Sequence, residues 1–177
     1  MEGWRMRKFA QAIDALNENA GYYSAFLVLP LLCVVSYEVI MRYGFNAPTS
    51  WGFEATTFLY GVHFVLGLGY THKHNGHVAI DVFEARLATR TRTLLRIAVN
   101  LIIFIPTMGL ISIWSVIYAG TAWMQGELAS SSWAPPLYPF KTLMAIGFVL
   151  LFLQGIAKLI HDFHHLNQPA FSGENPS

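Results

Sequence analysis

Charged residues and long polar segments are scarce in this chain. Asp, Glu, Lys and Arg together make up 12% of its 177 residues, whereas hydrophobic residues make up 54%. Soluble domains carry about a quarter charged residues, so a water-soluble fold of this size could not bury so much apolar surface. The connections between the apolar runs are also too short to house a catalytic centre. The sequence therefore predicts an all-α integral membrane protein that is not an enzyme.

Cysteine is nearly absent as well. The single cysteine, Cys33, lies inside an apolar run, so an internal disulfide is excluded and a small buried apolar role is expected. The chain also lacks a nucleophile next to a base, a phosphate-binding loop and a dinucleotide fingerprint. We therefore assign no catalytic and no substrate-binding residues to it.

Four apolar runs are long enough to cross a bilayer as helices. A helix needs about 20 apolar residues to do so. We expect a transmembrane domain over residues 21–161, with spans at about 22–43, 54–70, 94–125 and 139–160. The third run is longer than the hydrocarbon core requires, so it must tilt or project beyond the membrane, and Pro106 is expected to kink it.

The segments outside these runs are expected at the membrane surface. Within the N-terminal segment 1–20, residues 4–18 alternate apolar and charged side chains at helical spacing, which predicts a short interfacial amphipathic helix. A second such helix is predicted over Val78–Thr89. Ordinary solvated linkers are the alternative for both. The C-terminal tail, 162–177, is expected to be disordered because its last ten residues are rich in Pro, Gly, Ser and Asn.

The basic residues predict an orientation. Every Lys and Arg except Arg42 and Lys141 falls near the N-terminus, in or beside the second-to-third connection, or at the C-terminal end of the fourth span. Cytoplasmic connections of membrane proteins carry an excess of Lys and Arg. We therefore expect a multi-pass protein of a bacterial inner membrane with both termini cytoplasmic. Contacts with phospholipid headgroups are expected for three basic residues of that connection, Arg86, Arg90 and Arg92.

Three charged residues lie where the first and second spans meet. Glu38 and Arg42 are one helical turn apart near the outer end of the first span, and Glu54 begins the second span on the same side. Charges at this depth are costly, so they normally pair. We expect Arg42 to neutralise Glu38 and to reach Glu54 across the loop. A proton or ion relay is the alternative, but a relay needs further such groups through the bilayer. Ser50 is expected to cap the second helix.

The histidines raise the possibility of a cofactor or metal. His63 lies midway along the second span, but a haem between helices needs a second histidine at similar depth, so we interpret His63 as a hydrogen-bonded side chain. Two groups follow the second and fourth spans: His72, His74 and His77, and His161, His164 and His165. A joint zinc site is geometrically conceivable. Without a cysteine or a helix-spaced metal motif, however, we expect no bound metal and no cofactor.

Three stretches resemble one known family. The sequence EVIMRYGFNAPTSWGFE, from Glu38 to Glu54, is similar to the region between the first two helices in the small membrane subunit of TRAP transporters, the tripartite ATP-independent periplasmic transporters. The sequence GHVAIDV at residues 76–82 is similar to the stretch after the second helix. A Ser-rich loop with Trp133, Pro135 and Lys141 completes the likeness, which covers about residues 20–159. The family commonly has a second acid beside Glu54, where this chain has Phe53 and Ala55.

The resemblance implies partners and a role. Such a subunit pairs with a larger membrane subunit that holds the substrate and sodium sites, while a periplasmic binding protein delivers an organic acid with a carboxylate or sulfonate group. The small subunit would serve as an accessory scaffold that contacts phospholipids and no nucleic acid. In this interpretation Asn46 and Trp51 shape the outer loop, and Gly76, His77 and Asp81 shape the cytoplasmic turn.

Two other functions stay open from the residues alone. One is a small membrane metal or haem redox protein that uses the histidines. The other is a stand-alone homo-oligomeric channel or exporter. Secondary transporters bind substrate at broken helices in paired repeats near the midplane, and this sequence has neither repeat symmetry nor a polar midplane. The sequence therefore favours a subunit of a larger transporter.

Overall fold

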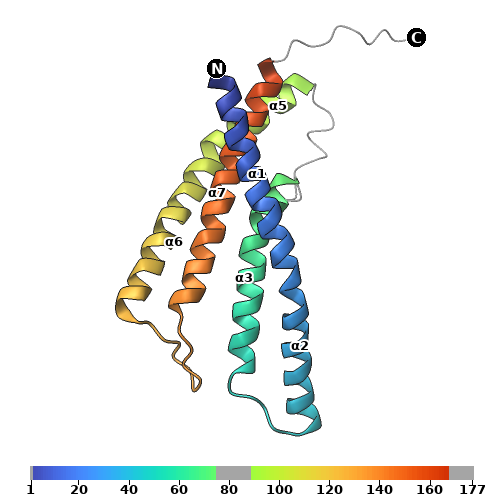
Figure 1. Cartoon of the computed structure of the whole chain (residues 1–177), viewed down its shortest axis with the longest axis vertical. Helices are drawn as coiled ribbons and strands as arrows, with labels where there is room; N and C mark the ends of the chain where they lie inside the picture. The colour runs from blue at the N-terminus through green and yellow to red at the C-terminus, as the bar shows by residue number, and fades with distance from the viewer. Residues whose placement is uncertain (1, 75–88, 168–177) are drawn as a thin grey trace, which may run out of the picture.

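The computed structural model describes residues 2–74 and 89–167, and the described part is built of helices (Figure 1). An isolated antiparallel bridge joins Leu128 to Pro136. Two of the helical segments, η1 and η2, are π-helical turns. The elements are α1 (Glu2–Phe26), α2 (Val28–Val39), η1 (Ile40–Gly44), α3 (Gly52–Lys73), α5 (Thr89–Val99), η2 (Asn100–Phe104), α6 (Ile105–Gln125) and α7 (Tyr138–Asn167).

Among the described helices, three stretches are long and apolar enough to cross a membrane. They are Trp4–Gly44, Thr91–Gln125 and Tyr138–His164. They confirm a multi-pass helical membrane protein. Helix α3, with 22 residues, is roughly 33 Å long at 1.5 Å per residue, which is sufficient for a span. It is not among the three most apolar stretches, so its role as the fourth span stays a prediction.

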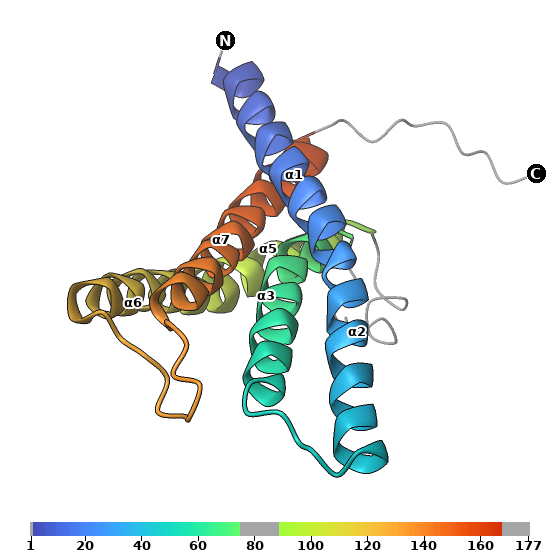
Figure 2. The same cartoon turned by 60° about the horizontal axis from the view of Figure 1, so that its bottom comes forward.

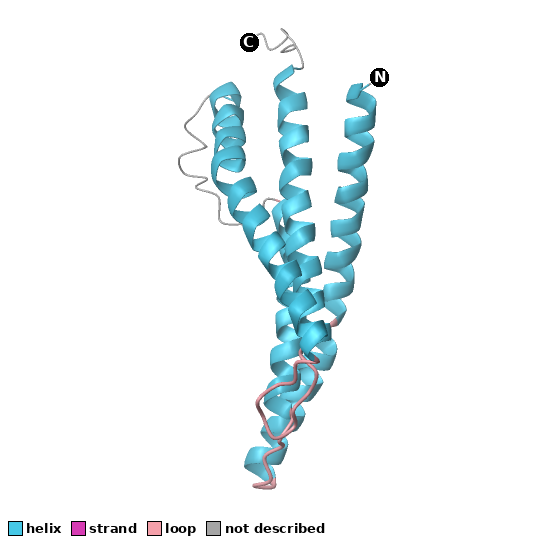
Figure 3. Cartoon of the chain, turned by 90° about the vertical axis from the view of Figure 1, so that its left-hand side faces the viewer, coloured by secondary structure: helices cyan, strands magenta, loops and turns pink. Residues whose placement is uncertain are grey.

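Helix α7 is the centre of the bundle. It packs against α1, α3 and α6, while α2 packs against α3. The N-terminus and the end of α7 lie at one end of the molecule, here called the terminal end (Figure 1). The loops 45–51 and 126–137 lie at the opposite end, here called the loop end (Figure 3). This arrangement places both connecting loops on one side of the bundle.

The N-terminal segment differs from the prediction. Residues 4–18 form no separate interfacial helix, because α1 runs without a break to Phe26. Ala10 and Ile13 are buried against Ala157 of α7. Phe9 and Leu16, at the same helical spacing, are more than half exposed, so only part of this face packs on another helix. Contact of the remaining face with the membrane surface stays a prediction. The second predicted interfacial helix, together with Gly76, His77, Asp81 and Arg86, lies outside the described residues.

A turn at Leu27 separates α1 from α2, and Figure 2 shows that the two helices meet at an angle. Pro30 explains the break, because proline has no N–H for the carbonyl four residues earlier and its ring crowds that carbonyl. The carbonyl of Ser24 accepts from Leu27 N at 3.0 Å and from His63 Nδ1 at 2.8 Å. The half-buried His63 is thus hydrogen-bonded, as predicted, and it ties α3 to the break.

The third predicted span is one helical stretch, in which a π-helical turn interrupts the α-helix just before Pro106. The π-helical turn η2 replaces regular α-helix immediately before this proline, which removes a hydrogen bond from the helix interior. Asn100, in the same turn, donates from Nδ2 to the carbonyl of Gly155 on α7 at 3.0 Å. At the C-terminus, the expected disorder from residue 162 is wrong for 162–167, which extend α7; residues 168–177 lie outside the described part.

Candidate functional site

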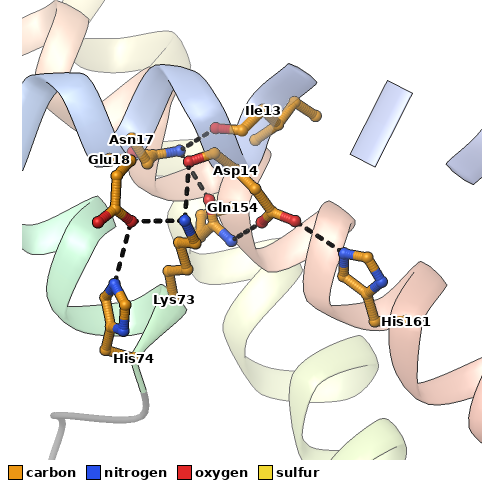
Figure 4. A network of polar contacts seen from close by, with 8 residues as sticks. All are labelled: Ile13, Asp14, Asn17, Glu18, Lys73, His74, Gln154 and His161. Carbon is orange, nitrogen blue, oxygen red and sulfur yellow. Dashed lines mark hydrogen bonds and ion pairs between the residues drawn. The ribbon is translucent and has the colours of Figure 1, made fainter. Parts of the chain in front are cut away.

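Polar side chains gather in two clusters, one at each end of the bundle. The loop-end cluster consists of Glu38, Arg42, Thr49 and Gly52. The terminal-end network consists of Asp14, Asn17, Glu18, Lys73, His74, Gln154 and His161 (Figure 4). The described bundle interior between them is mainly apolar, and a separate charge pair, Glu127–Lys141, holds the second loop.

The loop-end cluster is centred on the carboxylate of Glu38. Arg42 donates to Glu38 Oε1 from Nη2 at 2.5 Å and from Nε at 3.1 Å. Glu38 Oε2 accepts from the Thr49 hydroxyl and from Thr49 N at 3.3 Å. The Glu38 side chain is 13% exposed, whereas that of Arg42 is 50% exposed. One carboxylate therefore joins the end of the first helical stretch to the loop that follows it.

Thr49 is a member of this cluster that sequence reasoning missed. Its hydroxyl donates to Glu38 and accepts from Gly52 N at 3.1 Å, so it caps the start of α3. The predicted cap by Ser50 is therefore wrong. A Cβ added to Gly52 would lie 2.6 Å from Glu38 Oε2, so only glycine fits there. The signal was a threonine three residues before the first free N–H of α3.

Glu54 does not join the ion pair, which corrects the prediction for Arg42. Arg42 directs both Nε and Nη2 to Glu38, while Glu54 Oε2 is buried without a hydrogen-bond partner. The reason is proximity: Glu38 lies one turn before Arg42 on the same stretch, whereas Glu54 lies across the loop on α3. The first turn of α3, which holds Glu54, is a position where the helix dipole favours negative charge.

The loop between α2 and α3 also contains the two predicted loop-shaping residues. Asn46 adopts a left-handed conformation with φ of 51°, which asparagine tolerates better than most residues. Ala47 N then donates to the Met41 carbonyl at 2.9 Å. Trp51 stacks on Tyr37 of α2 with ring centroids 5.8 Å apart. Both residues thus lie in a loop that is folded back onto α2.

The second loop is held to α6 and α7 by its own charge pair. Lys141, only 8% exposed, pairs with Glu127 and lies over the ring of Tyr118, 3.7 Å from its centroid. Trp123 Nε1 donates to Thr142 Oγ1 at 2.8 Å. These contacts give the buried Lys141 a carboxylate and an aromatic face as partners, as a charge at a helix end requires.

The terminal-end network joins α1 to α7 through Asn17, which is fully buried. Asn17 Nδ2 donates to Gln154 Oε1 at 2.8 Å, and Gln154 Nε2 donates to Asp14 Oδ1 at 2.7 Å. Asp14 Oδ2 accepts from His161 Nε2 at 2.9 Å (Figure 4). Two residues of α1 are therefore bound to two residues of α7 across the helix interface.

The same network reaches α3 through Glu18. Lys73 Nζ donates to Glu18 Oε2 at 2.5 Å and to the Asp14 carbonyl at 3.2 Å, and His74 Nε2 donates to Glu18 Oε2 at 3.1 Å. Sequence reasoning missed this network because it assigned residues 4–18 to an interfacial helix and considered no partners for their polar side chains on other helices. The available signal was Gln154, an uncharged polar residue inside an apolar span, which favours a hydrogen-bonded partner on another helix.

The histidines are dispersed and have different partners. His72 stacks on Phe104 with ring centroids 4.3 Å apart, His74 binds Glu18 and His161 binds Asp14. His77, the third histidine of the group after the second span, lies outside the described residues. In the part of the chain that the structure describes, no three His, Cys, Asp or Glu side chains are placed to hold a metal ion.

The basic residues predicted to contact lipid are only partly described. Arg92 lies on α5, and Arg90 lies in its first turn. Lipid contact by these arginines stays a prediction. The two clusters, in contrast, have a defined geometry: each joins helices to one another through paired charges and hydrogen bonds. This arrangement defines a helical, multi-pass membrane protein whose described polar residues hold the bundle together.

Comparison with known families identifies the chain. Residues 31–165 match the model of the family described as tripartite ATP-independent periplasmic transporters, DctQ component. The chain therefore belongs to this family, as its sequence resemblance indicated. It is the small membrane subunit of a TRAP transporter, a multi-pass inner-membrane protein and not an enzyme. The family's complex also includes a large membrane subunit and a periplasmic binding protein. A comparison with curated protein sequences gave no match.

Proposed function

We propose that this chain is the scaffold of a sodium-coupled transporter that imports an organic acid with a carboxylate or sulfonate group. In this proposal the large subunit holds the substrate and sodium sites, and the binding protein delivers the acid at the loop end. Membership of the family supports the complex. The sodium gradient and the class of substrate are parts of the proposal that follow from the family resemblance.

The observation that carries the scaffold role is how the polar residues are used. At the loop end, Glu38 binds Arg42 and Thr49. At the terminal end, the buried Gln154 binds Asn17 and Asp14. Groups that bind a substrate would need free donors or acceptors, whereas Glu38 is bonded within its own helical stretch and the adjoining loop, and Gln154 is bonded across the α1–α7 contact. Their arrangement supports a rigid body against which a partner moves.

The outward faces of two helices suit lipid or a membrane partner. Leu29 and Leu32 on α2 are each 61% exposed, and Ile113, Trp114 and Ile117 on α6 are more than half exposed. Such apolar area is stable only in contact with lipid tails or with another membrane protein. It supports a subunit whose surroundings are hydrocarbon and the large subunit.

We also propose that the terminal end is cytoplasmic and the loop end periplasmic, because Lys and Arg gather at the terminal end. A cysteine-labelling experiment tests this. After Cys33→Ser, a Ser131→Cys variant should react in intact cells with a thiol reagent that cannot cross the inner membrane. The matched Arg5→Cys variant should react only after lysis. The opposite pattern would refute the orientation without affecting the family assignment.

Reconstitution tests the coupling and the substrate class. Liposomes holding both membrane subunits, with the loaded binding protein outside, should take up a carboxylate or sulfonate acid when sodium is higher outside. A potassium gradient of the same size serves as the control. Equal uptake with either cation would contradict sodium coupling, and uptake restricted to neutral or cationic solutes would contradict the substrate class.

A further inference from the structure

A basic groove lies at the terminal end, between the first turns of α1 and the last turns of α7, and it is separate from both polar clusters. It is lined by Trp4, Arg7, Lys8 and Gln11 of α1 and by His164 of α7, and its volume is about 450 Å³. Arg7 and Lys8 lie one turn before Ala10, which is buried against α7. The contact between α1 and α7 thus holds the two sides of the groove next to each other.

The lining of the groove suits an anionic, oxygen-rich ligand. Arg7 and Lys8 contribute two positive charges, and Gln11 and Trp4 contribute N–H donors. Among the described residues that line the groove there is no carboxylate. Lys8 Nζ lies 3.8 Å from the centroid of the Trp4 ring, a cation–π contact that holds the ammonium group beside the groove. Arginine and lysine are the residues that most often bind phosphate groups in proteins.

The position of the groove along the membrane normal indicates that the phosphate belongs to a lipid headgroup. Ala10 packs on Ala157, inside the apolar stretch Tyr138–His164. Arg7 and Lys8 lie one turn beyond Ala10, and His164 lies two turns beyond Ala157. These residues therefore reach the level where the apolar core gives way to headgroups. Tryptophan is enriched at this level in membrane proteins, and juxtamembrane Lys and Arg attract anionic lipids.

We propose that this groove binds the phosphate headgroup of an anionic phospholipid, with Arg7 and Lys8 as the main ligands. A lipid bound there lies across α1 and α7 at the terminal end. It thereby holds the N-terminal turns of α1, which project past α3, at the membrane surface. The inference requires that the bundle spans a membrane; it does not depend on sodium coupling or on the substrate.

Native mass spectrometry of the complex with its large subunit tests the proposal. The complex is delipidated in detergent and mixed with either phosphatidylglycerol or phosphatidylcholine. The unaltered complex should retain phosphatidylglycerol preferentially. Arg7→Gln and Lys8→Gln should each reduce retention about fivefold, the effect of one basic residue at an anionic surface. Arg5→Gln, which removes an exposed charge of the same helix outside the groove, should change retention far less.

Two further arms distinguish the possible outcomes. The charge-keeping variant Arg7→Lys/Lys8→Arg should retain the lipid, which separates loss of charge from loss of folding. Millimolar inorganic phosphate should not displace the lipid, because the acyl chains contribute to its binding. Equal retention of phosphatidylcholine, an equal loss in Arg5→Gln, or displacement by inorganic phosphate would each overturn the proposal.

Discussion

At the residue scale, the Glu38–Arg42 pair is the ion pair of the loop-end cluster. Removing the guanidinium by Arg42→Ala leaves the Glu38 carboxylate, which is only 13% exposed, without its cation in an apolar region. An unpaired charge in such surroundings is strongly unfavourable. We expect a several-fold fall in the amount of chain that co-purifies with the large subunit, and a matching fall in uptake.

A double variant shows whether Arg42→Ala acts through the unpaired charge of Glu38 or through the lost bulk of the arginine side chain. Glu38→Gln/Arg42→Ala removes both charges, so it should recover much of the complex that Arg42→Ala loses. Arg5→Ala, at an exposed site of α1, is the matched control and should co-purify normally. If Arg42→Ala gives normal yield and uptake, or if the double variant is as poor as the single one, charge pairing does not hold this loop.

Also at the residue scale, Gly147 sets how closely α3 and α7 approach. A Cβ at Gly147 would lie 2.4 Å from Val65 Cγ1 and 2.9 Å from the Val65 backbone carbonyl oxygen. Because the backbone cannot yield as a flexible side chain can, Gly147→Ala should force the helices apart at a cost of about 1–3 kcal/mol. A fall in the thermal midpoint of the purified complex measures this loss of stability.

Gly120→Ala is the matched control for that substitution. Gly120 lies in α6 with nothing within 4 Å of the added Cβ, so alanine there should leave the midpoint unchanged or raise it slightly. Equal destabilisation by both substitutions would mean that the close α3–α7 contact has no special importance for stability.

At the element scale, we expect Pro30 and His63 to be energetically coupled, because both act on the break between α1 and α2. His63 donates to Ser24, whose carbonyl also accepts from Leu27 N at the turn. His63→Phe should therefore destabilise the complex by about 1 kcal/mol, the size of an interhelical hydrogen bond in a membrane. In a Pro30→Ala background, where the helix can regain regular hydrogen bonds, the same substitution should cost less.

The thermal midpoints of the two single variants and the double variant measure this coupling. An additive result, with His63→Phe equally costly in both backgrounds, would show that His63 does not act through the break. Thr57→Val is a suitable control, because the Thr57 hydroxyl bonds to its own helix, at the Phe53 carbonyl, and is exposed.

Sequence periodicity and hydropathy were enough to predict most helices but not how they pack. The apolar runs predicted the first, third and fourth spans, and Pro106 predicted the irregular turn Asn100–Phe104. The spacing over 4–18 predicted a helix, but it could not show that this helix continues to Phe26. Nor could it show that Ala10 and Ile13 pack on Ala157, because that contact depends on how the helices are arranged in space.

The candidate sites were predictable only where partners are close in sequence. Glu38 and Arg42 are one turn apart, so helical geometry alone predicts their pairing. Asn17 and Gln154 lie at opposite ends of the chain, and their contact depends on the α1–α7 interface. Glu54 shows the converse: its charge and position suggested a partner, but the loop geometry leaves its Oε2 without one.

At the scale of the whole molecule, the bundle has a polar cluster at each end and apolar faces between them. The loop-end cluster closes the α2–α3 connection, and the terminal-end network binds α1 to α3 and α7. In a subunit that serves as a static support, these contacts should persist while the partner moves. In the proposed scaffold role, transport itself is carried out by the large subunit.

Transport by liposomes of defined subunit content tests this central claim most directly. Three preparations hold this chain alone, the large subunit alone, or both, with the same binding protein, acid and sodium gradient. We expect uptake only when both subunits are present. Flux through liposomes that hold this chain alone would contradict it and support a stand-alone channel or exporter, and full uptake by the large subunit alone would contradict an essential scaffold.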